Sequence, residues 1–173
     1  RNKQKIFFFA GEQSAEQFKN YLYVTMCQRN DLEFVKDEHN ENIYDVKPKD
    51  EKIKELDDKY KGMIYIYNNN NEHHTIKSLI KVMNIAIKKG VRIFFIDNFM
   101  QIDNTEKLEN QTNIIEQIKQ FTMRNKIILH LVVHPRKNNN YTSRLNLFDI
   151  AGTQNISNKA SNIFNIIRTD ILS

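Results

Sequence analysis

Short apolar runs alternate with amphipathic stretches along the chain, and this alternation predicts the order of its secondary structure. The expected strands are, in chain order, Ile6 to Ala10, Met63 to Tyr67, Arg92 to Asp97, Lys126 to His134 and Asn162 to Arg168. Helical periodicity is found between them, over about 14–29, 50–60, 72–89 and 105–123, with a helical turn near 155–161. Apolar strands separated by helices of this length are typical of a mostly parallel sheet with helices on both faces, so we expect an α/β fold.

Local signals place some of the helix boundaries. Ser14 is a capping residue with an acid close behind it, and the helix that it begins should run to about Arg29. One face of that helix is expected to carry Phe18, Leu22, Thr25 and Met26. Gly90 should end the helix over 72–89, and the adjacent His73 and His74 are expected to be exposed at its start. The stretch from Asn30 to Pro48 mixes strand-like pieces with polar turns.

Composition narrows the class of protein. The chain has 173 residues, which suits one domain with a sizeable core. Its formal charge of +5 is compatible with a polyanionic partner but too small to establish one. Cys27 is the only cysteine, which excludes an intrachain disulfide and fits an intracellular, reducing compartment. No apolar stretch reaches the roughly 20 residues that span a bilayer, so we expect no membrane partner.

Polar side chains of three chemically active types follow three of the expected strands. Glu12 comes just after the first, Asp97 ends the strand that begins at Arg92, and His134 ends the strand that begins at Lys126. Because the carboxyl ends of parallel strands meet at one edge of a sheet, these residues should converge there, where open α/β sheets bind ligands. Taken alone, Asp97 is as well explained as a residue that caps the turn after its strand.

Four segments resemble the RecA-like helicase domain of the DnaB, Twinkle and phage T7 primase-helicase superfamily. Phe7 to Gln17 looks like the apolar strand, glutamate and Ser-x-Glu-Gln helix start that follow the P-loop helix in that family. Ile93 to Asp97 resembles its Walker B strand. Leu131 to Lys137, with His-Pro-Arg-Lys, is similar to the third helicase motif in its Twinkle form, and Asp149 to Asn162 matches the fourth motif in spacing. The four follow the family's order over most of the chain.

The resemblance implies a RecA-like sheet, ATP and Mg²⁺ as cofactors, and a replicative DNA helicase that couples ATP hydrolysis to translocation on single-stranded DNA and duplex unwinding. Glu12 would polarise the water that attacks the γ-phosphate. Asp97 would hold Mg²⁺ as the Walker B acid, and His134 would sense the γ-phosphate. The plainer alternatives are a helix-start charge for Glu12, a turn cap for Asp97 and a satisfied polar group for His134.

The resemblance also implies a nucleic-acid surface. Arg136 and Lys137 would open a cationic loop, continuing through Arg144, that faces the channel of a hexameric ring. In the fourth motif, Gly152 would permit close backbone approach to DNA, and Asn155 or Lys159 would touch phosphate. An ordinary solvated loop is the alternative. Lys159 and Ser161 stand where the family usually has acidic residues, so the ion pairing of those acids should be absent or rewired.

Gly11, Gly62, Gly90 and Gly152 are the only glycines, and none stands in a Gly-x-x-x-x-Gly-Lys-Ser/Thr loop. In the family the P-loop precedes the segment that begins at Arg1, and the arginine finger follows the last strand. We therefore expect a core fragment of a ring-forming enzyme that does not hydrolyse ATP alone. Within that class, a recombinase or clock-type ATPase is the alternative. Outside it, the alternative is a non-catalytic single-strand-binding or scaffold module. An organelle with its own DNA, a mitochondrion or plastid, is a location worth considering.

Overall fold

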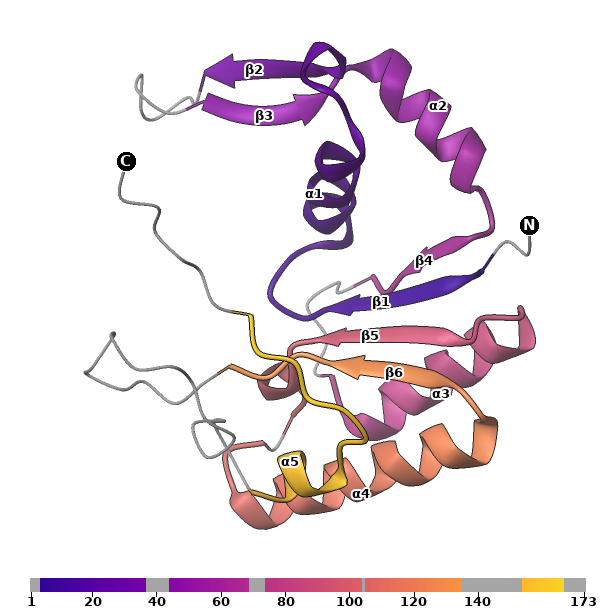
Figure 1. Cartoon of the computed structure of the whole chain (residues 1–173), viewed down its shortest axis with the longest axis vertical. Coiled ribbons are helices and arrows are strands. Elements are labelled where there is room, and N and C mark those ends of the chain that lie inside the picture. Colours follow the sequence, from indigo (N-terminus) through magenta and orange to yellow (C-terminus); the bar gives the residue numbers. More distant parts are fainter. Residues whose placement is uncertain (1–3, 37–43, 69–73, 104, 135–153, 167–173) are drawn as a thin grey trace.

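We describe the protein from a computed structural model that places residues 4–36, 44–68, 74–103, 105–134 and 154–166 (Figure 1). The helices are α1 (Ala15–Met26), α2 (Asp50–Tyr60), α3 (Ile76–Lys88), α4 (Leu108–Asn125) and α5 (Asn155–Lys159). The strands are β1 (Ile6–Ala10), β2 (Leu32–Lys36), β3 (Tyr44–Pro48), β4 (Ile64–Ile66), β5 (Ile93–Asp97) and β6 (Ile128–Leu131). Two short 3-10 helices are η1 (Arg29–Asp31) and η2 (Phe99–Gln101).

Four parallel strands form the central sheet, in the order β4-β1-β5-β6. β1 pairs with β4 on one side and β5 on the other, and β5 pairs in turn with β6. The register places Ala10 opposite Asp97 and Ile96 opposite Leu131, so the carboxyl ends of β1, β5 and β6 lie side by side. The predicted α/β class is confirmed, and the sheet is consistent with a RecA-like core.

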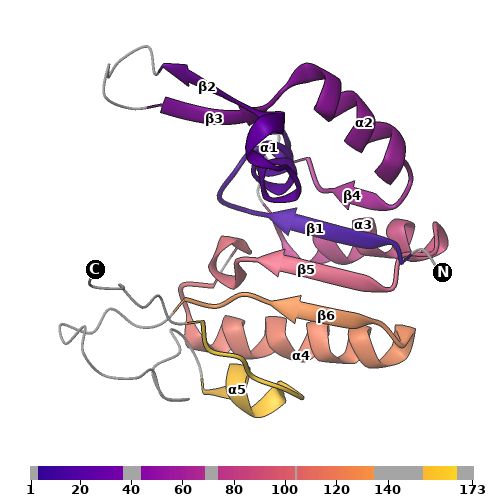
Figure 2. The ribbon, with the colours of Figure 1, turned by 45° about the horizontal axis from the view of Figure 1, so that its top comes forward.

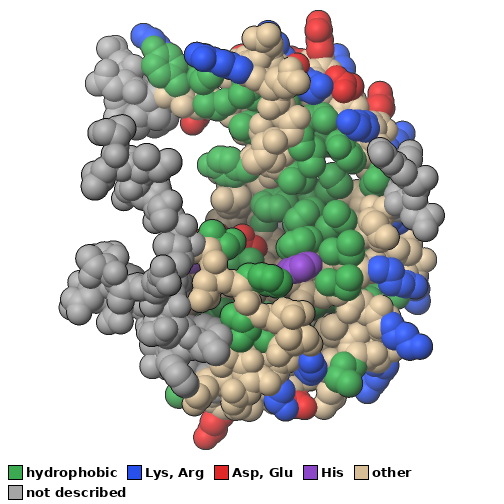
Figure 3. Space-filling view, viewed as in Figure 1, with side chains coloured by type: hydrophobic (Ala, Val, Ile, Leu, Met, Phe, Trp, Pro, Cys, Tyr) green, Lys and Arg blue, Asp and Glu red, His purple; other side chains and the backbone are tan. Residues whose placement is uncertain are grey.

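Helices lie on both faces of the sheet, but they cover the faces unequally (Figures 1 and 2). On one face α3 and α4 bury alternate strand residues, with Phe94 and Ile96 fully buried and Phe9 only 1% exposed. On the other face Phe18 of α1 packs against Phe8, with 5.1 Å between the ring centroids. This second face is more open over β6, where Ile128 is 58% exposed, and Figure 3 shows apolar side chains at the surface across the middle of the molecule.

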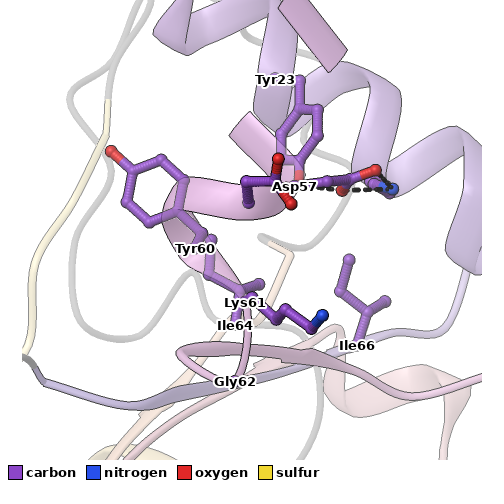
Figure 4. Close-up of a pocket in the computed structure, with 9 residues that line it drawn as sticks. Tyr23, Asp57, Tyr60, Lys61, Gly62, Ile64 and Ile66 are labelled. Atoms are coloured by element: carbon purple, nitrogen blue, oxygen red, sulfur yellow. Dashed lines mark hydrogen bonds and ion pairs between the residues drawn. The ribbon is translucent and has the colours of Figure 1, made fainter. Parts of the chain in front are cut away.

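α1 and α2 are joined by a polar contact at the rim of a pocket of about 420 Å³ (Figure 4). The Tyr23 hydroxyl donates to the Asp57 carboxylate at 2.7 Å, and the Lys19 ammonium lies 2.7 Å from the same oxygen. Burial, followed by the hydrogen bond to Asp57, raises the pKa of Tyr23. The polar groups at this rim therefore satisfy one another, and the pocket is not lined by Glu12, Asp97 or His134.

The elements follow the predicted order, but their boundaries do not all agree. β6 covers Ile128–Leu131, so Lys126 and His134 lie outside it. α1 differs at its end and in part of its face. Its start is as expected, because the Ser14 hydroxyl accepts the Gln17 N–H and the Gln17 side chain accepts the Ser14 N–H. It ends at Met26 instead of about Arg29, and its one buried residue is Tyr23, whereas Met26 is 37% exposed. Two residues of the predicted face, Phe18 and Leu22, are partly buried, and Phe18 packs against Phe8, whereas Thr25 and Met26 are exposed. Tyr23, whose hydroxyl donates to Asp57 of α2, is buried instead.

The strand-like pieces expected before α2 are present, as an antiparallel hairpin of β2 with β3 that is separate from the main sheet. Two further expectations are corrected. His74 is half-buried rather than exposed, because Phe9 and Tyr67 pack edge-on against its ring, and His73 lies outside the described residues. Residues 162–166 form no strand, and Phe164 and Ile166 are 81% and 94% exposed. An apolar run alone does not make a strand without a neighbour to complete its ladder. The rest of that predicted strand, residues 167–168, lies outside the described residues.

Within the part of the chain that the structure describes, no helix combines the length and the apolar character needed to cross a membrane.

Replacing Tyr23 with phenylalanine should lower the free energy of unfolding by about 1 kcal/mol at neutral pH, because the Asp57 carboxylate loses a hydrogen bond. Hydrogen bonds from Lys19 and then Tyr23 lower the pKa of Asp57. The carboxylate therefore stabilises the fold above the ordinary carboxyl range, and this contribution is lost as the pH falls through the lowered pKa. The difference between the two proteins should shrink in acid.

Urea denaturation at neutral and acidic pH measures this effect. Tyr21, 59% exposed on the same helix, supplies the matched control, and Tyr21→Phe should leave the stability unchanged. A Tyr23→Phe variant as stable as the wild type at neutral pH contradicts the assignment.

Candidate active site

Backbone hydrogen bonds beyond the ladder hold the carboxyl ends of three strands together. The Gly11 N–H donates to the Asp97 carbonyl at 2.6 Å, which ties the end of β1 to the end of β5. The Val132 N–H donates to the Ile96 carbonyl at 2.9 Å, and the Phe99 N–H donates to the Val132 carbonyl at 3.0 Å. These bonds fix where the side chains that follow each strand emerge, so the site rests on rigid elements.

Glu12 and His134, predicted to converge, meet at this edge. The distance from His134 Nε2 to Glu12 Oε1 is 3.5 Å, although 122 residues separate them in sequence (134 − 12). Their side chains are 56% and 52% exposed, so both remain accessible to a ligand from solvent. A carboxylate and an imidazole in this relation can accept a proton from water and donate a hydrogen bond to an anion.

Asp97 lies close enough to both residues to feel their charges. Partial removal of water from its carboxylate raises the pKa of Asp97, and the negative charge of Glu12 raises it further, whereas His134 lowers it. Two carboxylates that repel each other in this way gain stability when a cation comes between them. Mg²⁺ is commonly held by one or two carboxylates together with water and phosphate oxygens, so Asp97 fits that ion.

A metal ion can also be bound by protein side chains alone, without water or phosphate ligands. In the described ranges, no group of three or more His, Cys, Asp and Glu side chains could hold a metal ion by itself.

Asn98 is the site residue that sequence reasoning missed. It is completely buried, and its side-chain amide donates to Glu12 Oε1 and lies 2.8 Å from His134 Nε2. Its carbonyl oxygen accepts the Met100 N–H at 2.8 Å and so caps η2. The one signal in the sequence was a second polar residue directly after Asp97, at a point where the apolar residues Phe99 and Met100 follow.

Gly11 is required by the close approach of η2. A Cβ at this position would lie 2.7 Å from Cγ of Gln101, whose amide nitrogen is 3.5 Å from Glu12 Oε1. Any side chain at position 11 would therefore push η2 away from the strand ends.

The predicted nucleic-acid residues divide into two groups. Arg136, Lys137, Arg144 and Gly152 lie outside the described residues. Asn155 and Lys159 lie on α5 and contact α4, where the Asn155 amide donates to the Thr112 hydroxyl at 3.1 Å and the Lys159 ammonium pairs with Glu116 at 2.6 Å.

Lys159 takes part in an ion pair although it stands where the family usually has an acid. Glu116 on α4 supplies an acid for Lys159, and Lys119 on α4 donates to the Ser161 hydroxyl at 3.3 Å. The hydrogen bond from Lys159 lowers the pKa of Glu116. A DNA phosphate would have to compete with Glu116 for Lys159, which weakens the case for that contact.

Comparison with known proteins found no matching family model and no matching curated protein.

Replacing Asp97 with asparagine should stabilise the protein in a metal chelator at neutral pH, because the ionised carboxylate is partly desolvated and is also repelled by Glu12. Solvent screening keeps the expected gain below about 1 kcal/mol. A carboxyl whose pKa is raised on folding costs stability once it is ionised and costs nothing when protonated in both states. The gain should therefore be present at neutral pH and disappear as the pH falls toward the ordinary carboxyl range.

Thermal denaturation of both proteins at neutral pH and in acid tests whether Asp97→Asn is stabilising and whether the gain disappears in acid. Asp58→Asn, at an exposed position on α2, controls for the loss of one negative charge. Loss of stability in Asp97→Asn at neutral pH would contradict the cost assigned to the desolvated Asp97 carboxylate beside Glu12.

Proposed function

We propose that this chain is the core of a ring-forming replicative DNA helicase that couples ATP hydrolysis to translocation on single-stranded DNA and to duplex unwinding. The observation that carries the proposal is the meeting of Glu12, Asp97 and His134 at the carboxyl edge of a parallel sheet. The fold class supports it, as do the four segments that resemble helicase motifs in the same order. The proposed enzyme also needs a phosphate-binding loop, encoded upstream of Arg1.

Each site residue has a role that its surroundings permit. The Glu12 carboxylate, held by Asn98 and open to solvent, accepts the proton of an attacking water and orients it. Asp97 would hold Mg²⁺, which when bound neutralises charge on the β- and γ-phosphates. His134 donates a hydrogen bond toward the phosphate oxygens from beside Glu12.

The link between hydrolysis and movement begins at His134. This residue directly precedes the segment that contains Arg136, Lys137 and Arg144, so a change in its phosphate contact is passed along the backbone into a cationic stretch. That stretch is proposed to contact the DNA backbone, because phosphate contacts by Lys and Arg supply sequence-independent binding. Translocation then requires neighbouring subunits to pass through this change in turn, which is the reason for proposing a hexameric ring.

The rival function is a single-strand-binding or scaffold module that keeps the fold without hydrolysis. One observation favours it: none of the four glycines in the sequence stands in a Gly-x-x-x-x-Gly-Lys-Ser/Thr motif. Reading the coding sequence upstream of Arg1 separates the two functions. A Gly-Lys-Thr or Gly-Lys-Ser in a glycine-rich loop, between a strand and a helix, is expected for the enzyme. Its absence from the full reading frame would favour the binding module.

In the full-length protein, Glu12→Gln should reduce DNA-stimulated ATP hydrolysis by about 10²- to 10⁴-fold, because an amide cannot accept the proton of water. Binding of ATP, measured separately by fluorescence titration, should change little. Glu16→Gln is the matched control, since Glu16 is an exposed acid in the first turn of α1, and it should hydrolyse ATP as the wild type does. Wild-type rates in Glu12→Gln would refute the assignment of Glu12 as the base.

A further inference from the structure

The Asn98 side chain has only one orientation that satisfies its surroundings. Its Oδ1 accepts the Met100 N–H at 2.8 Å, and an amide nitrogen in that place would set two donors against each other. Nδ2 therefore faces the site, where its neighbours are Glu12 Oε1 and His134 Nε2. The asparagine is fully buried, so water offers its side-chain amide no alternative partner.

This orientation of the Asn98 amide determines the tautomer of the neutral His134 ring. Amide nitrogen can only donate, and its two hydrogens serve the Glu12 carboxylate and the His134 ring. Nε2 of His134 must therefore accept, which places the proton of the neutral imidazole on Nδ1. The donor that His134 offers to an incoming anion is then Nδ1–H.

The same contacts distinguish the two oxygens of Glu12. Within the described part of the chain, the hydrogen bonds from Asn98 and Gln101 both end on Oε1, and Nε2 of His134 lies 3.5 Å from the same oxygen. Oε2 is thereby the oxygen available to a water molecule. A carboxylate whose first oxygen is held in this way cannot rotate without breaking contacts, so its second oxygen keeps a fixed direction.

We propose that Asn98 is the positioning residue of this site, which orients the Glu12 carboxylate for water through Oε2 and holds His134 as the Nδ1–H tautomer for phosphate. Its contribution to hydrolysis rests on the proposed function, whereas its control of the tautomer does not. Capping η2 alone does not account for the geometry. A cap needs only the Oδ1 acceptor, which aspartate and serine also supply, and leaves both Nδ2 hydrogens without a purpose.

Asn98→Asp separates capping from positioning. Aspartate has nearly the same shape and still accepts the Met100 N–H, but it offers carboxylate oxygen where Nδ2 stood. Neutral His134 should then turn to the Nε2–H tautomer, because an acceptor faces that nitrogen. Asn98→Ser keeps a cap acceptor with a shorter side chain and should leave a mixture of the two tautomers.

The imidazole ¹⁵N chemical shifts of the labelled chain, recorded at mildly alkaline pH, report the tautomer directly. We expect Nδ1–H for His134 in the wild type and Nε2–H in Asn98→Asp. His130 on β6, which stacks on Phe95 at 4.4 Å, is an internal reference that should stay unchanged and confirms folding of each variant. Nε2–H in the wild type overturns the proposal without any variant. An unchanged His134 in folded Asn98→Asp or Asn98→Ser overturns it as well.

The catalytic consequence has its own readout in the full-length protein. Asn98→Asp and Asn98→Ser should both lower kcat for ATP by about 10²-fold, as expected when a reacting group is misplaced, with little change in KM. Unchanged kcat in both variants would remove Asn98 from the mechanism. If the wild type hydrolyses no ATP, the proposed function fails, whereas the tautomer measured in the shorter chain still decides the geometry.

Discussion

The pairing of β5 between β1 and β6 is the interaction on which the site depends. Parallel pairing sets Ala10 beside Asp97 and Ile96 beside Leu131, and hydrogen bonds past the strand ends extend this alignment to Gly11 and Val132. A slip of one residue would turn every side chain of a strand to the opposite face. The buried set that includes Phe94 and Ile96 prevents such a slip, because it would expose the core. Core packing and site geometry therefore have the same physical origin.

Much of this arrangement could be predicted, because it follows from the hydrophobic periodicity of the sequence and from the order of its strands and helices. Apolar runs with polar residues at their ends predicted β1 and β5, and the common edge of parallel strands predicted that Glu12 and His134 would meet. Asn98 was out of reach of this reasoning, since its partners lie 86 and 36 residues away and its role depends on complete burial. The face of α1 and the loss of the last predicted strand likewise depend on tertiary neighbours, which local periodicity does not contain.

Charged side chains are arranged differently on α5 and at the carboxyl edge of the sheet. Lys159 is neutralised by Glu116 and helps to hold α5 on α4, whereas Asp97 and Glu12 repel each other at an accessible edge. An ion pair such as Lys159 with Glu116 stabilises the folded protein by itself. Two neighbouring carboxylates destabilise it, and they become favourable when a cation binds between them. Retained repulsion at a sheet edge is a common property of sites that bind metal and phosphate, and it gives the edge its chemical character.

Magnetic resonance of the full-length protein with Mn²⁺ in place of Mg²⁺ and a non-hydrolysable ATP analogue tests the central claim most directly. Mn²⁺ broadens the signals of nuclei close to it. If this edge holds the metal and the triphosphate, the ring signals of His134 will broaden on addition of the analogue, and those of His130, on the sheet face four residues earlier, will broaden much less. Equal broadening of the two rings, or none at His134, would contradict the account.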